Sequence, residues 1–248
     1  MKLSVYRERL ASEPRSVSLW RDVFAEFVAT FMLVSVQSAL PLTWGEAGIG
    51  GPVQTALGMG FIVCTMAWTF GDFSGGHMNP AVTFSMALSA KITVVRALFY
   101  VIAQCAGGAA GTGFVYLLTP SSHREGLSAT MVNAELEPWQ GMLVEAWITA
   151  ILVLTIYGST NDKRKDTLFM PTIPIGFAIT LGILTGWKYT GGSMNPARSF
   201  GPAIILNLWK DHWQVYWIGP LLGGAMATLI YVGFFDRIGR RHVSLSDK

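Results

Sequence analysis

Long apolar stretches, separated by short polar segments, run through most of this chain. Six of them are long enough to be compared with a lipid bilayer, and they cover about residues 19–42, 52–72, 92–118, 139–158, 168–187 and 213–235. An α-helix needs roughly 20 mostly apolar residues to cross the ~30 Å hydrocarbon core of a membrane. The pattern therefore predicts an all-α membrane protein with six transmembrane helices.

Two further apolar stretches, residues 79–88 and 195–208, are too short to span, and each begins with Asn-Pro-Ala. The first has ten residues, and because a helix rises ~1.5 Å per residue it would reach only ~15 Å. Asn is favoured at a helix N-cap because its side-chain oxygen accepts a backbone N–H, and Pro suits the next position. We therefore predict two re-entrant half-helices, which begin at Asn79 and Asn195.

The two halves of the chain repeat one another. The same 116 residues separate Asn79 from Asn195 and the Gly-Gly-Ala segment at 107–109 from the one at 223–225. Each half holds three spans, an odd number, so the second half must enter the membrane from the opposite side. This pattern indicates an inverted-repeat bundle. The predicted parts are a tail over 1–18, a first repeat over 19–118, an outer loop over 119–138, a second repeat over 139–235 and a basic tail over 236–248.

Composition and charge agree with a membrane location. Hydrophobic residues make up 51% of the chain and charged residues only 13%. With both termini on one side, that side holds fourteen of the eighteen Lys and Arg residues. Because cytoplasmic loops carry the excess of Lys and Arg, we expect an integral protein of the plasma membrane with both termini cytoplasmic. The partner is the lipid bilayer, and the net charge of +3 is no sign of nucleic-acid binding.

The two cysteines, Cys64 and Cys105, both fall inside apolar spans. Such positions are typical of buried free thiols, so the sequence predicts no disulfide framework, no metal site and no cofactor.

The loops before the half-helices are the candidate pore. Irregular backbone at membrane depth survives only where it is buried in protein or lines water. Two half-helix N-termini, each worth about +0.5 charge, raise a barrier to cations and protons but not to neutral solutes. Amide donors of Asn79 and Asn195 would face the lumen at the pore centre, although each Asn-Pro pair taken alone is also an ordinary helix cap. The expected lining backbone belongs to Gly75, Gly76, His77, Gly191 and Ser193.

Three charged residues lie at membrane depth, where ionisable groups are costly and usually functional. Arg198 is expected at a constriction that repels cations, or as a tether for the loop. Glu26 and Glu145 are expected to support the loops by accepting backbone N–H bonds, and the alternative is a proton relay. His77 either lines the pore or holds its loop.

These segments resemble the aquaporin, or major intrinsic protein, family. The resemblance rests on the stretches around the two Asn-Pro-Ala motifs, residues 74–83 and 190–202, and on Trp-Ile-Gly-Pro-Leu-Leu-Gly-Gly at 217–224. It implies a homotetramer with one pore per subunit that transports passively and is not an enzyme. Ser199 stands where the glycerol-conducting branch typically has Asp, which points to the water-channel branch.

The resemblance also locates an outer constriction, which departs from the water-specific pattern. Its four positions are Met59, Ile183, Gly192 and Arg198. The Phe and His of the water-specific pattern are absent, which leaves a less polar opening. This combination resembles the branch that passes ammonia, hydrogen peroxide or urea as well as water. Met59 would otherwise be a packing residue of its span.

The leading interpretation is a passive water channel that excludes protons and ions. One alternative is a membrane junction or adhesion protein of the same fold with low permeability, and another is an ion-coupled transporter. The tails carry two candidate phosphorylation sites, Ser12 and Ser244, each three residues after an Arg.

Overall fold

The computed structural model describes residues 12–43, 51–124, 126–161, 170–210 and 213–236. Within these ranges the chain is helical and has no strand. Six long helical segments account for most of it: α2 (Val17–Ala39), α3 (Pro52–Ser74), α5 (Val94–Leu118), α6 (Pro138–Ser159), α7 (Thr172–Thr190) and a final segment of η4 (Gln214–Ile218), α9 (Gly219–Thr228) and η5 (Leu229–Asp236). The η4 and η5 parts of the final segment are π-helical.

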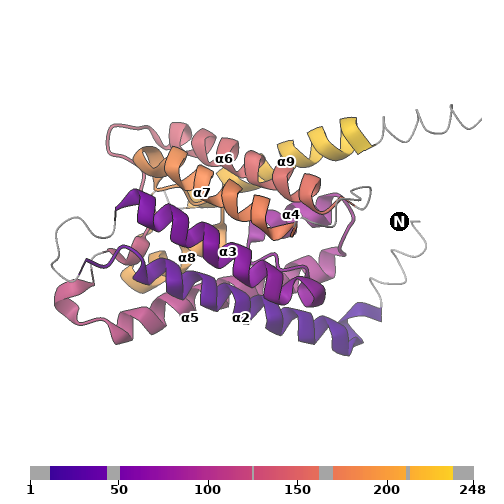
Figure 1. Ribbon diagram of the computed structural model, residues 1–248, viewed down its shortest axis with the longest axis horizontal. Coiled ribbons are helices and arrows are strands. Elements are labelled where there is room, and N and C mark those ends of the chain that lie inside the picture. The colour runs from indigo at the N-terminus through magenta and orange to yellow at the C-terminus, as the bar shows by residue number, and fades with distance from the viewer. Residues whose placement is uncertain (1–11, 44–50, 125, 162–169, 211–212, 237–248) are drawn as a thin grey trace, which may run out of the picture.

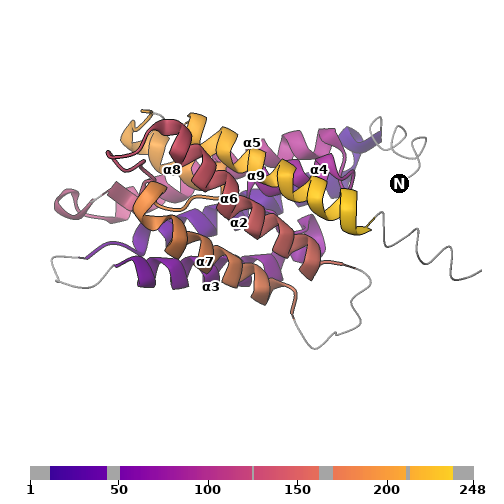
Figure 2. The same ribbon diagram turned by 90° about the horizontal axis from the view of Figure 1, so that it is seen from above.

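Two short helices, α4 (Pro80–Leu88) and α8 (Pro196–Leu206), follow the two Asn-Pro-Ala motifs. The remaining elements are 3-10 turns: η1 (Glu13–Arg15), η2 (Ser121–His123) and η3 (Gly126–Ser128). The long helices lie side by side along one direction, with α4 toward one end of the bundle and α8 toward the other (Figures 1 and 2). Helix α2 begins and η5 ends at the same end, the one that also holds α4.

The two halves of the chain are interlocked rather than placed side by side. Within each half the first long helix packs against the third, α2 on α5 and α6 on α9, while α3 packs on α7 between the halves. Each half-helix crosses over: α4 packs against α9, and α8 packs against α5. The half-helices are therefore held at depth by long helices of the opposite repeat.

Glycines allow the helix backbones to approach this closely. A Cβ atom on Gly60 of α3 would lie 2.7 Å from the carbonyl oxygen of Gly176 on α7, and a Cβ on Gly176 would lie equally close to the oxygen of Gly60. A Cβ on Gly107 would lie 2.5 Å from the carbonyl oxygen of Phe27 on α2. Small residues at helix crossings are the usual means of close packing in membranes, where lipid offers no hydrophobic drive for helix association.

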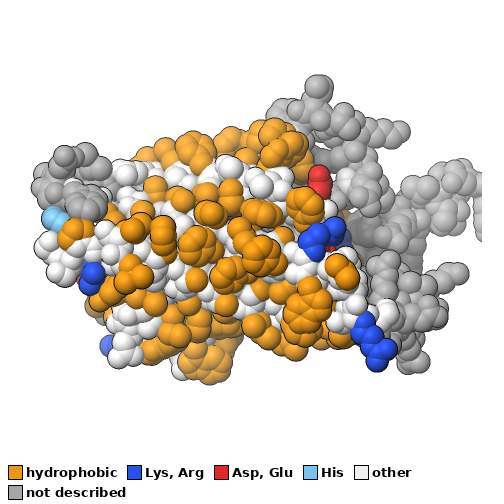
Figure 3. Space-filling view, turned by 90° about the horizontal axis from the view of Figure 1, so that it is seen from below, with side chains coloured by type: hydrophobic (Ala, Val, Ile, Leu, Met, Phe, Trp, Pro, Cys, Tyr) orange, Lys and Arg blue, Asp and Glu red, His pale blue; other side chains and the backbone are white. Residues whose placement is uncertain are grey.

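The outside of the bundle is apolar. Large hydrophobic side chains such as Phe24, Phe61, Leu117 and Phe177 are more than half exposed, and the face in Figure 3 shows such side chains along its length with Lys and Arg only toward the ends. By length and composition, four segments of the described chain are able to cross a membrane: Pro52–Ser74, Val94–Leu118, Pro138–Ser159 and Gln214–Phe235. Helices α2 and α7 pack along them in the same bundle. The protein is therefore a helical membrane protein, with two half-helices enclosed by six long helical segments.

The glycine packing can be tested with one methyl group. A Cβ on Gly223 would overlap the carbonyl oxygen of Ala146, whereas a Cβ on Gly158 meets nothing within 4 Å. Because overpacking a fixed backbone contact costs ~1–3 kcal/mol, Gly223→Ala should lower the thermal stability of the purified protein in detergent. Gly158→Ala, the matched control, should change it by less than about 1 kcal/mol. Equal stability of the two variants would contradict the packing.

Candidate pore

The two Asn-Pro-Ala motifs begin their half-helices in the same way. The side-chain oxygen of Asn79 accepts a hydrogen bond from the backbone N–H of Ala81 at 2.8 Å. That of Asn195 accepts from the N–H groups of Ala197 at 3.0 Å and Arg198 at 3.3 Å. Both Asn residues have extended backbone and are followed by Pro. The predicted caps are therefore present, with each side-chain oxygen committed to its own half-helix.

The side-chain amides of the same two residues tie the half-helices together. Asn79 Nδ2 donates to the carbonyl oxygen of Met194, and Asn195 Nδ2 donates to that of Met78, both at 2.8 Å. The expected arrangement had these donors free in the lumen. Instead, one N–H of each amide is used to cross-link the two loops, and since the group carries two, one N–H per residue remains.

A buried carboxylate holds the first loop. Glu26 of α2 is fully buried and accepts four hydrogen bonds of 2.6–2.8 Å. The donors are the hydroxyl of Ser74, the backbone N–H groups of His77 and Met78, and the side-chain amide of Gln104. Buried polar groups in folded proteins almost always have a hydrogen-bond partner. Here one side chain supplies that partner to loop N–H groups that have no water to bond to.

The second loop is held by the equivalent group. Glu145 of α6, also fully buried, accepts from the Thr190 hydroxyl at 2.6 Å and from the N–H groups of Ser193 and Met194 at 2.8 and 2.7 Å. These are the contacts that a loop-supporting carboxylate makes. They join each acid to its own loop, and no second acid or histidine side chain accepts from or donates to either carboxylate among the described residues.

Two tyrosines, which sequence reasoning did not single out, belong to the same support. The Tyr100 hydroxyl donates to the carbonyl oxygen of Ser74 at 3.0 Å, and the Tyr216 hydroxyl donates to that of Thr190 at 2.9 Å. The pairs are related by the same 116-residue offset as the two Asn-Pro-Ala motifs. Applying that offset to every polar residue of the spans would have found them.

The loops need left-handed backbone that favours glycine. Gly75 and Gly76 have φ of 89° and 60°, and Gly191 and Gly192 have 81° and 66°. The residues after them, Met78 at 50° and Met194 at 57°, also have positive φ despite their side chains. Such a conformation is uncommon for residues other than Gly, Asn and Asp. Here it is held because each Met N–H donates to a Glu carboxylate and each Met carbonyl accepts from an Asn amide.

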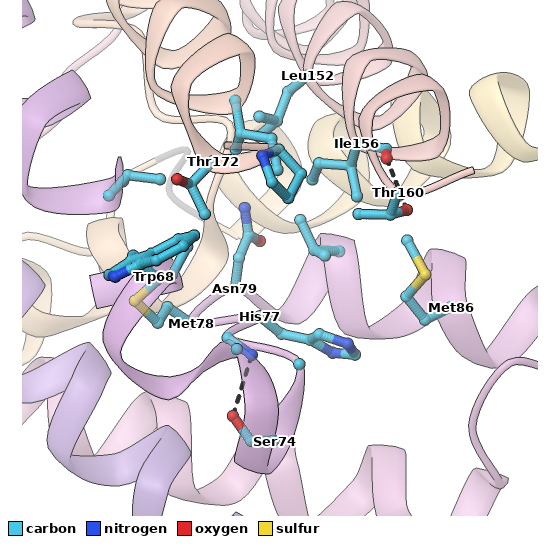
Figure 4. A pocket seen from close by; sticks show the side chains of 18 of the residues that line it. Trp68, Ser74, His77, Met78, Asn79, Met86, Leu152, Ile156, Thr160 and Thr172 are labelled. Carbon is cyan, nitrogen blue, oxygen red and sulfur yellow. Dashed lines mark hydrogen bonds between the residues drawn. The ribbon is translucent and has the colours of Figure 1, made fainter. Parts of the chain in front are cut away.

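A cavity of about 600 Å³ leads away from the two Asn side chains. It extends past the side chains shown in Figure 4 toward the ends of α4 and α6 and the start of α7. Of the predicted lining backbone, Gly75, Gly76 and His77 lie on this cavity, and Gly191 and Ser193 do not. Much of the rest of its wall is aliphatic, formed by Leu33, Val63, Val82, Leu152, Ile156, Ile175 and Ile179.

His77 borders the cavity and also takes part in holding its loop. Its ring lies on the cavity wall, and its Nδ1 is 3.1 Å from the hydroxyl oxygen of Thr83. The ring also meets Tyr100 edge-on, with 5.5 Å between ring centroids. Gln104 donates to the same Thr83 hydroxyl at 2.8 Å, so the histidine is part of the network that ties the first loop to α4 and α5.

The four predicted constriction residues lie outside the cavity lining. Met59, Ile183 and Arg198 are each at most 3% exposed. Met59 and Ile183 belong to one buried cluster, and a Cβ on Gly192 would lie only 2.8 Å from the Cα of Ile183. The structure thus places Ile183 next to Gly192, and it packs Met59 within the same hydrophobic core.

Arg198 is tied to the outer loop. Its Nη1 donates to the carbonyl oxygen of Ser128 at 2.9 Å, and its own carbonyl accepts from Gln37 Nε2 at 3.1 Å. Its Nε is buried and has no hydrogen-bond partner among the described residues. An unpaired buried donor is costly, and a passing solute or water could accept from it. Tethering and a role toward solutes are therefore compatible.

Ser199 follows this arginine and lies in a chain of hydroxyls. Its Oγ is 2.6 Å from that of Ser193 and accepts from the Thr130 hydroxyl at 2.6 Å. The outer loop thus reaches the second half-helix at two neighbouring positions. Together, Ser128 and Thr130 hold the loop over this end of the bundle.

The remaining predictions concern the tail serines, the cysteines and metal binding. Ser12 is exposed and precedes η1, while Ser244 lies outside the described residues. Cys64 and Cys105 are free thiols. Among the described residues no group of three or more His, Cys, Asp or Glu side chains is placed to hold a metal ion.

The supporting role of the carboxylate can be tested by replacing one oxygen of Glu145 with an amide NH₂ group. In Glu145→Gln an NH₂ group replaces one acceptor and faces N–H donors, so one buried loop donor loses its partner at a cost of ~1–3 kcal/mol. We expect lower thermal stability and lower water permeability per reconstituted subunit. Glu135→Gln, at an exposed position, is the control and should match the parent. Parental behaviour of Glu145→Gln would exclude the support role.

Comparison with known proteins identifies the family that has this architecture. The family model described as major intrinsic protein matches residues 13–231. Aquaporin-4 of Mus musculus is 43% identical over 217 residues, covering 86% of this chain and 67% of that protein. Aquaporin-5 of Sus scrofa is 40% identical over 240 residues, covering 96% and 89%. In fold, an aquaglyceroporin from Plasmodium falciparum superposes with a TM-score of 0.76 at 23% identity, covering 86% of this chain and 95% of that one. With two half-helices meeting through paired Asn-Pro-Ala motifs, the chain belongs to the major intrinsic protein, or aquaporin, family.

Proposed function

We propose that this protein is a passive transmembrane water channel that excludes protons and ions and catalyses no reaction. The observation that carries the proposal is the meeting of two opposed half-helices at Asn79 and Asn195, at the end of a cavity of about 600 Å³. The loop N–H groups are satisfied by Glu26 and Glu145, which holds the two helix N-termini beside a cavity whose wall is largely aliphatic.

The same meeting point supports proton exclusion. Each half-helix contributes about +0.5 charge at its N-terminus, and the two ends meet through the Asn side chains. The remaining N–H of each Asn amide offers a donor to the oxygen of a passing water. A water held by two donors cannot also accept a proton along the file, so the proton-conducting chain is interrupted. Arg198 adds a full positive charge on the outer side.

The outer region supports passage of small neutral solutes besides water. Ile183 and Gly192, in contact with each other, supply neither a side-chain donor nor a bulky polar group. Met59 is flexible and polarizable. A constriction of this character passes ammonia, hydrogen peroxide and urea more readily than a constriction that contains His.

The assembly and location follow from the exterior. The apolar side chains around the bundle need lipid or other subunits, and a homotetramer with one pore per subunit covers part of them. The Lys and Arg distribution supports a plasma-membrane protein with both termini in the cytoplasm. In that orientation the cavity beside His77 opens inward and the arginine lies outward.

Water permeability is measured by stopped-flow light scattering of liposomes that contain the purified protein. We expect shrinkage to be several-fold faster than that of empty liposomes prepared in the same way. An internal pH dye should report no added proton flux. Water flux equal to that of empty liposomes would exclude the proposal.

Solute choice is tested at Ile183. The Ile183→His variant places a polar imidazole at the outer constriction, so peroxide and urea uptake should fall roughly tenfold, which corresponds to ~1.4 kcal/mol, while water flux persists. Ile183→Leu keeps an apolar side chain of equal volume and should conduct as the parent does. If His and Leu variants pass the solutes equally, the constriction lies elsewhere.

A further inference from the structure

A thioether stands at the inner side of the pore centre. The side chain of Met78, the residue before Asn79, lines the cavity of about 600 Å³ and is labelled on its wall in Figure 4. The cavity reaches both Asn side chains there. Met78 therefore borders the same cavity as Asn79 and Asn195.

The backbone of Met78 cannot move away from this position. Its N–H donates to Glu26 Oε2 at 2.6 Å, and its carbonyl accepts from Asn195 Nδ2 at 2.8 Å. Its φ of 50° lies in the left-handed region, which is unfavourable for a residue with a side chain. The two hydrogen bonds hold the backbone in this conformation. The side chain stays on the cavity wall whatever its own rotamer.

The symmetry-related residue, Met194, has the same backbone but a different environment. Its N–H donates to Glu145 Oε2 at 2.7 Å, its carbonyl accepts from Asn79 Nδ2 at 2.8 Å, and its φ is 57°. Its sulfur, however, occupies the space that a Cβ on Gly182 would need, and it does not line the cavity. Both methionines are buried, at 2% and 1% exposure, and of the two only Met78 borders the cavity.

We propose that Met78 is a site of reversible oxidative modification, at which a small neutral peroxide entering the cavity converts the thioether to a sulfoxide and slows water flow. The sulfur attacks one peroxide oxygen, an S–O bond forms and the O–O bond breaks. Sulfur loses two electrons and the peroxide gains them. The proton of the attacked oxygen passes to the departing hydroxide, so hydrogen peroxide yields one sulfoxide and one water.

The product changes the pore chemically. A sulfoxide turns a flexible apolar side chain into a polar one with a strong acceptor oxygen. Beside Asn79, the sulfoxide oxygen competes with passing water for the amide N–H that is not used in the cross-link between the loops. The sulfoxide also narrows the cavity next to the Asn pair. Water flux should fall several-fold, whereas oxidation of Met86, on the second turn of α4, leaves the Asn pair untouched.

The experiment uses the full-length protein in liposomes, treated with hydrogen peroxide and then with dithiothreitol. Dithiothreitol reverses sulfenic acids and disulfides of Cys64 and Cys105 but leaves methionine sulfoxide. We expect a gain of one oxygen atom in mass on the peptide that contains Met78 and a several-fold, dithiothreitol-resistant loss of water permeability, each relative to the untreated sample. Treatment with methionine sulfoxide reductases in detergent, followed by reconstitution, should restore the flux.

Three leucine variants of similar side-chain volume assign the effect. Met78→Leu should retain its own untreated permeability after peroxide, whereas Met194→Leu and Met86→Leu should lose theirs as the parent does. Equal loss in Met78→Leu, or no mass gain at Met78 while exposed Met131 is oxidised, would overturn the proposal. The permeability readout rests on the proposed water-channel function, but the mass gain at Met78 does not, so the two can fail separately.

Discussion

The structure depends on two carboxylates that replace water for backbone N–H groups in the middle of the bundle. Loops at membrane depth have no solvent to bond, and an unsatisfied N–H there costs several kcal/mol. Glu26 and Glu145, each fully buried, accept two such N–H groups and a hydroxyl from the loop they face. Once the loops are held, the half-helices that follow them have fixed starting points, and the Asn side chains can meet.

The two repeats share this frame but fill it differently, and the difference has functional weight. In the first repeat His77 and Gln104 join the loop to Thr83, and the loop lies on an open cavity. In the second repeat Ser193 takes the place of the histidine, Met194 fills the space beside Gly182, and Gly192 packs on Ile183. One end of the path is therefore wide and the other closely packed. A symmetrical scaffold carries an asymmetrical pore, so the two ends can serve different tasks.

In the function that we propose, solute choice and proton exclusion depend on different groups. We attribute proton exclusion to the two helix ends and the two Asn amides, which the repeated motif supplies. We attribute solute choice to side chains around the second loop, of which Ile183 and Gly192 are close enough to touch and Arg198 is tied to Ser128. Substitutions at these positions can alter what passes without disturbing the central cross-link, because the carboxylate support lies on α2 and α6.

Local sequence patterns were enough to predict the helical segments, the two half-helices and their caps: runs of apolar residues, Asn before Pro, and a repeat offset of 116 residues. They also indicated a role for the two acids, because ionisable groups at membrane depth are costly. Three-dimensional contacts were needed to show that the Asn amides bond the opposite loop, that Tyr100 and Tyr216 bond the loops, and that of the two loops the first borders the cavity. Those facts depend on which backbone groups of one repeat come within hydrogen-bond distance of the other, and no local pattern carries that distance.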